Sequence, residues 1–290
     1  MDSSDPQLII SSNRKRKAQD STMVNCKRTK FMKTYQRQNF SMPDSIIFYI
    51  AKNPKTAELY LKMVKTCKYF FVKNPIIILP TLKADDGKWR VNEKPLDFTK
   101  YNCKYWITGE IYASAYESVD ENILSPIIPK IYRCDVKRLY LYSQVMSFDD
   151  LSLIVSSAEK IYLKNVIVKH SDSSDIPLED IVAIAVKAKE IYVTKPTITS
   201  KTMKELLQIP HFATLDQFVK NQHTKFFLYF DDSISDAYKN RLELFIDEIL
   251  ETKEIDYIPP FICCPERDRE KSQKLSQKLF PFFLKSFFIV

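Results

Sequence analysis

This sequence of 290 residues has very little glycine: it contains two glycines, Gly87 and Gly109. Average usage of about 7% would give roughly twenty. A loop that cradles phosphate groups needs clustered glycines, because its backbone must approach the ligand closely and adopt positive φ angles. Two glycines far apart cannot form such a loop, so nucleotide-binding enzymes of the usual glycine-motif types are excluded.

Histidine is almost as rare, with His170, His211 and His223 as its three copies. None lies in an HExxH motif or in a recognisable triad context. The aspartate pairs Asp149-Asp150 and Asp231-Asp232 lie near the starts of expected elements, where they are typical of capping and dipole compensation. The sequence therefore predicts no enzyme, no catalytic residues and no cofactor.

The six cysteines form no C-x-x-C pair, so the sequence predicts no structural metal site. Free core thiols in a reducing compartment are the simplest interpretation. The first ten residues lack the basic region and apolar core of a secretory signal. No apolar run approaches the roughly 20 residues of a membrane helix, so we expect no membrane partner.

The basic charge of the chain is concentrated in residues 1–39. This tail holds nine of the 44 Lys/Arg and three of the 36 Asp/Glu, a net charge of +6, which leaves 35 basic and 33 acidic residues for the remainder. The tail has only scattered apolar residues, so we expect it to be disordered. The nearly neutral remainder gives no electrostatic footprint for nucleic acid.

Two basic clusters in this tail resemble a bipartite nuclear localisation signal, with ten residues between Lys15-Arg16 and the second cluster. The resemblance implies binding to an import receptor and a nuclear protein, with the cytoplasm as the second location. The competing interpretations are a non-specific RNA or DNA contact and a solubilising tail. The import residues implied are Arg14, Lys15, Arg16, Lys17, Lys27, Arg28 and Lys30.

Three short apolar-periodic segments follow between Phe40 and Phe71. The first, 44–51, places three isoleucines on one helical face. Asn53-Pro54 indicates an N-cap and a first helical position, and the next helix carries Leu59, Met63 and Cys67 at a spacing typical of a buried face. Because domains below about 40 residues usually need outside help, these helices require a partner surface.

This stretch resembles an F-box, the adaptor-docking motif of cullin-type ubiquitin ligases. Met42-Pro43 stands at the opening, apolar residues fill both helices, and Thr66-Cys67-Lys68 stands at the closing turn, where Tyr69-Phe70 replaces the usual tryptophan. The alternative is an ordinary three-helix start to a globular domain. The adaptor-binding residues that the resemblance implies are Met42, Pro43, Ile46, Ile47, Ile50, Leu59, Met63 and Phe70.

From residue 131 onward an internal repeat is visible. Period-2 segments at 136–141, 158–163 and 188–193 predict strands, and 215–218 is a degenerate fourth. Helical patterns follow at 148–155, 178–188 and 200–207. A strand and a helix every 20 to 30 residues is the leucine-rich-repeat pattern, whose units stack into a curved solenoid. The asparagine that regular repeats carry is replaced by Gln144, Val166 and Pro196.

The expected fold class is therefore α/β: a short N-terminal helical F-box-like unit followed by an irregular leucine-rich-repeat-like array of strands and helices. The generic alternative is an ordinary α/β domain. Divergent F-box-like proteins of nematodes combine the same two parts, and the chain resembles them. The expected domains are a disordered tail at 1–39, the F-box-like unit at 40–74, a connecting α/β region at 75–130 and the repeat domain at 131–290.

Within the connecting region, 75–80 reads as a short strand or extended linker, and 81–104 reads as a polar loop. Trp89 and Trp106 are expected to anchor the junction between the helical start and the body. Near the C-terminus, the pattern predicts a strand at 226–230, a helix capped at Ser233, a strand at 261–264, a charged helix at 266–278 and an apolar tail at 279–290.

These features favour a non-enzymatic recruitment protein whose helical unit binds a ligase adaptor subunit and whose strands bind an unidentified substrate protein. A second hypothesis is a nuclear scaffold or nucleic-acid-associated protein acting through its basic tail. Tyrosine is favoured at protein interfaces, although it is also a good strand former. The expected partner-binding residues are Tyr140, Tyr142, Tyr162 and Tyr192.

Overall fold

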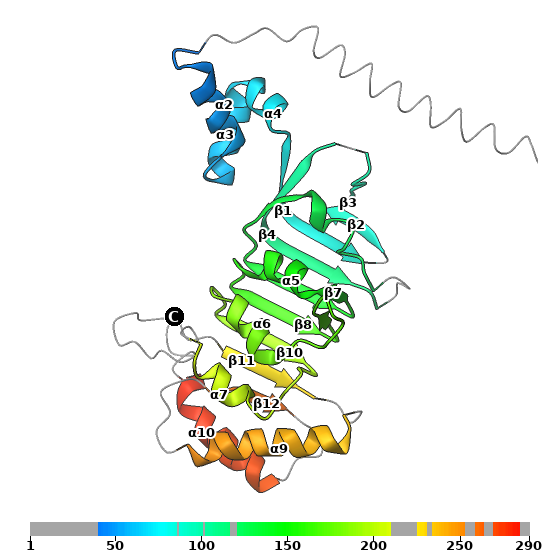
Figure 1. Cartoon of the computed structure of the whole chain (residues 1–290), viewed down its shortest axis with the longest axis vertical. Helices are drawn as coiled ribbons and strands as arrows, with labels where there is room; N and C mark the ends of the chain where they lie inside the picture. The colour runs from blue at the N-terminus through cyan, green and yellow to red at the C-terminus, as the bar shows by residue number, and fades with distance from the viewer. Residues whose placement is uncertain are drawn as a thin grey trace, which may run out of the picture.

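The computed structural model describes residues 40–85, 87–100, 102–116, 121–209, 225–230, 234–252, 259–263 and 269–284. These residues form a helical unit at one end, a long sheet in the middle and two further helices at the other end (Figure 1). The import clusters of the tail and the degenerate fourth strand at 215–218 lie outside the described residues. No helix in the described part of the chain is long and apolar enough to cross a bilayer.

The helical unit consists of α2 (Asp44–Lys52), α3 (Ala57–Thr66) and α4 (Lys68–Lys73). Ile47, Ala51 and Phe70 form its small buried core. The expected helix start at Asn53-Pro54 is wrong: Asn53 is the C-cap of α2. The N-cap of α3 is Thr56, whose hydroxyl accepts a hydrogen bond from the Leu59 amide, because a hydroxyl can satisfy a free amide of the first turn.

A ten-stranded sheet in the order β12-β11-β10-β8-β6-β4-β1-β2-β3, with β5 also paired to β4, forms the body. The β1–β2–β3 ribbon is antiparallel and the other pairings are parallel. The structure is thus mixed α/β around a mostly parallel sheet. The strands are β1 (Ile76–Asp85), β2 (Lys88–Val91), β3 (Lys94–Pro95), β4 (Lys104–Ser114), β5 (Ile131–Cys134, after the 3-10 turn Ile128–Lys130), β6 (Arg138–Tyr142), β8 (Lys160–Lys164), β10 (Glu190–Thr194), β11 (Lys225–Tyr229) and β12 (Phe261–Cys263).

The polar loop expected at 81–104 is wrong, because residues 81–85, 88–91 and 94–95 form the end of β1 and the strands β2 and β3. Leu82 and Ala84 are buried, whereas the polar residues that alternate with them, Thr81, Lys83 and Asp85, are partly exposed. A strand with one solvated face alternates in this way. β4 pairs with both β1 and β6, so one sheet continues across residue 131.

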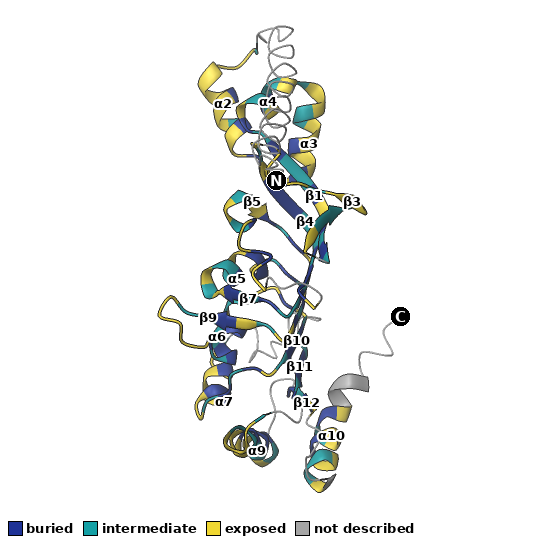
Figure 2. Ribbon diagram, turned by 90° about the vertical axis from the view of Figure 1, so that its right-hand side faces the viewer, coloured by how far each residue is buried: buried dark blue, intermediate teal, exposed yellow. Residues whose placement is uncertain are grey.

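Three helices cover one face of the sheet: α5 (Phe148–Val155), α6 (Leu178–Ile184) and α7 (Thr202–Leu206) (Figure 2). A separate two-stranded sheet, β7 (Val145–Ser147) with β9 (Ile167–Lys169), lies on the same side. The strands expected at 136–141, 158–163 and 188–193 are confirmed to within two residues, and so is the helix at 148–155. Their inward side chains are fully or almost fully buried: Leu139, Leu141, Ile161, Leu163, Ile191 and Val193.

The three central strands end in the same turn. Ser143, Asn165 and Lys195 follow β6, β8 and β10, and each has φ of 53°. The amide of Ser143 donates to the Lys164 carbonyl over 2.9 Å, and the amide of Lys195 donates to the Tyr229 carbonyl over 2.9 Å. The turn geometry therefore repeats with the strands, although none of these positions is a glycine.

The C-terminal part closes the sheet with α9 (Asp236–Glu251) and α10 (Arg269–Leu284). The helix cap is Ser235 rather than the expected Ser233. Lys271 pairs with Glu243 and Asp247 of α9. The strands expected at 226–230 and 261–264 are confirmed as β11 and β12, whereas α10 extends beyond residue 278 into the expected apolar tail.

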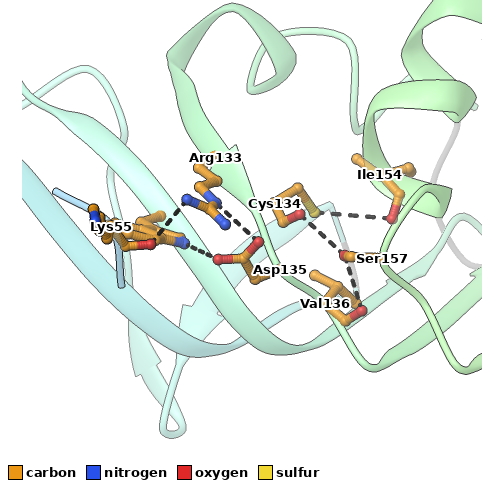
Figure 3. A network of polar contacts seen from close by, with 8 residues as sticks. Lys55, Arg133, Cys134, Asp135, Val136, Ile154 and Ser157 are labelled. Atoms are coloured by element: carbon orange, nitrogen blue, oxygen red, sulfur yellow. Dashed lines mark hydrogen bonds and ion pairs between the residues drawn. The ribbon is translucent and has the colours of Figure 1, made fainter. Parts of the chain in front are cut away.

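Cys134 lies inside this framework at the end of β5. Its thiol is within 3.9 Å of the Ile154 carbonyl, and its own carbonyl accepts a hydrogen bond from the Ser157 hydroxyl (Figure 3). Burial raises the pKa of the Cys134 thiol from 9.0 to about 12. Because the pKa is higher in the folded state, burial of the neutral thiol contributes fully to the free energy of unfolding below pH 9. That contribution is lost as the pH rises toward 12.

We therefore expect Cys134 to resist alkylation by iodoacetamide at pH 8, because its thiolate fraction is about a thousandfold smaller than that of an ordinary thiol. Peptide mass spectrometry after timed labelling measures this. The exposed Cys263 is the internal control, and unfolding in urea should equalise the two. Equal labelling of both cysteines in the folded protein would contradict the burial of Cys134.

Candidate interaction surfaces

The helical unit exposes many large apolar side chains for its size. Met42, Ile46 and Leu59 are 45%, 46% and 42% exposed. Soluble proteins seldom gather so many large apolar side chains in solvent on so small a unit unless they bind something. We refer to the exposed residues of this unit as the docking set: Met42, Ile46, Phe48, Tyr49, Leu59, Leu61 and Phe71.

The structure divides the expected adaptor-binding residues into two groups. Met42, Pro43, Ile46 and Leu59 are exposed, and Ile50 and Met63 are half-buried. Ile47 and Phe70, which were expected to contact an adaptor, lie in the core of the helical unit. They are buried there and pack its helices together. The buried stripe expected at Leu59, Met63 and Cys67 is also wrong: α3 buries Ala57 and Tyr60 instead.

This inversion has a local cause. Tyr60 and Ala57 pack against Ile76 of β1 and Trp106 of β4, so the sheet selects the face of α3 that it buries. Four members of the docking set, Phe48, Tyr49, Leu61 and Phe71, were not expected from the sequence. Phe48, Tyr49 and Leu61 lie off the four-residue apolar stripes of α2 and α3, which is their one sequence signal, and Phe71 lies on α4.

Tyr60 joins the helical unit to the first strand. Its hydroxyl donates to the Asn74 carbonyl over 2.7 Å and accepts from the Ile76 amide over 3.1 Å. The Asn74 side chain donates in turn to the Ala51 carbonyl over 3.1 Å. Burial raises the pKa of Tyr60, so its hydroxyl stays protonated and the junction keeps its donor.

A second set of contacts fixes the unit to β4 and β5. The Trp106 indole donates to Asp135 over 2.7 Å, and the Arg133 guanidinium donates to the same carboxylate over 3.0 Å. Arg133 also lies 5.0 Å from the Trp106 ring centroid and donates to the Lys55 carbonyl over 3.2 Å (Figure 3). Trp106 is therefore at the junction as expected, whereas Trp89 packs edge-to-face on Phe98 within the body.

The face of the sheet opposite α5, α6 and α7 carries a row of tyrosine rings. Tyr112, Tyr140 and Tyr162 are in register on β4, β6 and β8, and Tyr192 continues the row on β10. Consecutive ring centroids from Tyr140 to Tyr229 are 5.0, 5.4 and 4.5 Å apart, with interplanar angles of 27°, 24° and 25°. We refer to this row as the tyrosine ladder: Tyr112, Tyr140, Tyr162, Tyr192 and Tyr229.

Three of the expected partner-binding residues are ladder members, and the fourth, Tyr142, lies beside it. The Tyr142 ring is 5.3 Å from that of Tyr112 and 5.8 Å from that of Tyr116. Tyr112 and Tyr229 were missed, because Tyr112 joins the row through its register with Tyr140 and Tyr229 through a diagonal ring contact with Tyr192. All the ladder tyrosines are partly exposed. The row is therefore packed side by side, and part of each side chain remains accessible.

Charged residues flank the ladder. At the amino ends of the strands, Arg138 pairs with Glu110 over 2.9 Å and Lys160 pairs with Glu190 over 2.9 Å. At the carboxyl ends, Lys164 lies 5.7 Å from the Tyr116 ring centroid. Among the described residues no carboxylate pairs with Lys164.

The ladder hydroxyls are hydrogen-bond donors at neutral pH. Burial is the main cause that raises the pKa of Tyr142, Tyr162, Tyr192 and Tyr229. Tyr162 donates to Glu190 over 3.3 Å. Among the described residues no protein group accepts a hydrogen bond from the hydroxyls of Tyr112, Tyr140, Tyr192 or Tyr229.

The described residues contain no group of three or more His, Cys, Asp or Glu side chains that could hold a metal ion. His170 packs beside Phe148 at 5.7 Å. The chain matches no protein-family model, no curated protein and no solved structure.

Proposed function

We propose that this chain is a non-enzymatic recruitment protein. Its docking set would bind the adaptor subunit of a cullin-type ubiquitin ligase, and its tyrosine ladder would bind the protein that is to be modified. The observation that carries the proposal is the pairing of an exposed apolar set on a small helical unit with a solvated aromatic row on the sheet to which that unit is fixed.

Several features support the leucine-rich-repeat-like part of this proposal. The strands and helices alternate with a repeated turn. Gln144, at the position where regular repeats carry asparagine, donates from its buried side chain to the Tyr142 and Ser143 carbonyls. A side-chain amide that satisfies turn carbonyls performs the task that the asparagine ladder performs in regular repeats. The basic clusters in the tail support delivery to the nucleus by an import receptor.

The adaptor interaction is tested by pull-down of the full chain with the purified adaptor subunit. The double variant Ile46→Asp/Leu59→Asp should bind more than tenfold more weakly, because buried apolar contacts at an interface centre dominate binding energy. Both side chains are exposed in the free chain, so the variant should keep its melting temperature within a few degrees.

The matched control is Val186→Asp/Leu244→Asp, which changes two exposed apolar residues of the body. It should bind the adaptor as the unaltered chain does. Failure of the folded, unaltered chain to bind the adaptor would sink the ligase proposal and favour a nuclear scaffold or nucleic-acid partner acting through the tail.

A further inference from the structure

In the tyrosine ladder, the flat faces of neighbouring rings stack against one another. Neighbours from Tyr140 to Tyr229 are stacked at 4.5 to 5.4 Å. A ring that stands upright between two others presents only its edge and its hydroxyl to solvent. A ligand on this face therefore meets a row of apolar ring edges tipped with hydrogen-bond donors, at the strand spacing of about 4.8 Å.

A polyproline II segment that crosses the strands matches this spacing. It repeats every three residues with a rise of about 3.1 Å per residue, so equivalent groups recur about every 9.3 Å, close to two strand spacings. An extended β-strand repeats about every 6.7 Å and an α-helix about every 5.4 Å. Neither repeat is close to a multiple of the spacing of about 4.8 Å between neighbouring strands. The four strand spacings of the ladder, roughly 19 Å, need about six polyproline II residues.

The hydrogen-bonding needs of such a segment also fit. A polyproline II backbone makes no internal hydrogen bonds, and each proline supplies a carbonyl acceptor without a competing amide. The hydroxyls of Tyr140 and Tyr192 are donors without a protein acceptor among the described residues. Proline rings pack well on aromatic side chains, and the preformed conformation loses little entropy on binding.

The charges on the two flanks differ. The amino-end flank is neutralised within the protein by the Arg138–Glu110 and Lys160–Glu190 pairs. On the carboxyl-end flank, Lys164 lies 5.7 Å from the Tyr116 ring centroid and has no carboxylate partner in the described structure. An acidic side chain in the ligand would supply the missing charge.

From these observations we propose that the tyrosine ladder binds an extended, proline-rich peptide segment that carries an acidic residue beside Lys164. Single-stranded nucleic acid fits less well, because bases stack on exposed aromatic faces and phosphates need a basic groove. Here the faces are occupied and two of the flanking cations are paired. This inference rests on the part of the proposed function in which the tyrosine ladder binds the protein to be modified. It does not depend on adaptor binding by the docking set.

The test is fluorescence anisotropy with the full chain and no adaptor, so its failure leaves the adaptor result standing. The probe is a labelled peptide of about nine prolines with Asp-Glu at each end. The matched probe replaces the prolines by alternating Gly and Ser, and a third probe is an oligothymidine of about twelve nucleotides. We expect saturable binding of the proline peptide, with the Gly/Ser peptide at least tenfold weaker.

Three variants separate ligand contacts from structural effects. Tyr140→Phe/Tyr192→Phe removes two hydroxyls and keeps both rings, and it should weaken the proline peptide about tenfold or more without changing the melting temperature. Lys164→Gln should weaken that peptide but not a version with uncharged ends. Tyr49→Phe, an exposed tyrosine of the helical unit, should change nothing.

Absence of saturable binding to the proline peptide would overturn the proposal. So would equal binding of the Gly/Ser peptide, tighter binding of the oligothymidine, or an unchanged affinity in the Tyr140→Phe/Tyr192→Phe variant.

Discussion

Trp106→Ala is expected to lower the free energy of unfolding by about 3–5 kcal/mol and to loosen the helical unit from the sheet. Trp106 is fully buried and packs with Ala57, Tyr60 and Ile76. Its removal leaves a cavity at the junction and takes away the indole donor to Asp135. Urea unfolding measures the loss, and limited proteolysis between α4 and β1 reports the loosening.

The matched control is Trp89→Ala. Trp89 is only partly buried and lies beside Phe98, away from the helical unit. It should cost less stability and leave the α4–β1 connection as resistant to protease as in the unaltered chain. Equal protease sensitivity in the two variants would show that Trp106 does not hold the junction.

Gly109→Ala should cost about 3 kcal/mol or more, because it overpacks a site that cannot relax. A Cβ at this position would lie 2.4 Å from the Pro80 carbonyl oxygen, which is backbone. The Gly109 carbonyl is itself held, since it accepts a hydrogen bond from the Lys137 amide over 2.8 Å. The strand therefore cannot shift away from Pro80 without losing a contact on its other side.

The comparison for this variant is Gly87→Ala. Gly87 has φ of 67°, and alanine in that left-handed conformation costs roughly 1–2 kcal/mol. Chemical denaturation of both variants measures the difference, and both should unfold at lower denaturant concentration than the unaltered chain. If Gly109→Ala were the milder change, the close approach of β4 to Pro80 would be refuted.

The central strands were predictable because their inward residues are apolar on alternate positions, as in Leu139 and Leu141. The β2–β3 ribbon was not, because its solvated residues read as a loop. The choice of which helical face is buried also escaped prediction. Tyr60 is buried only because Ile76 and Trp106 from distant strands meet it, and local periodicity carries no information on that contact.

The residues of the tyrosine ladder were also predictable only where the sequence repeats. Tyr140, Tyr162 and Tyr192 were recognisable because they recur at one position of each repeat. Tyr112 joins the row through strand register with Tyr140, and Tyr229 joins it through a diagonal ring contact with Tyr192. A single repeat encodes neither relation. The apolar composition of the helical unit was visible in the sequence, whereas the assignment of Ile46 to solvent and Ile47 to the core required the packed structure.

One strand, β4, carries both the junction residue Trp106 and the first ladder ring, Tyr112. Six residues of strand place them roughly 20 Å apart, with no flexible linker between them. A protein held by the docking set and a peptide held by the ladder would thus keep a constant separation and angle. Selection of a lysine on the recruited protein would then depend on where that lysine lies in space rather than on the sequence around it.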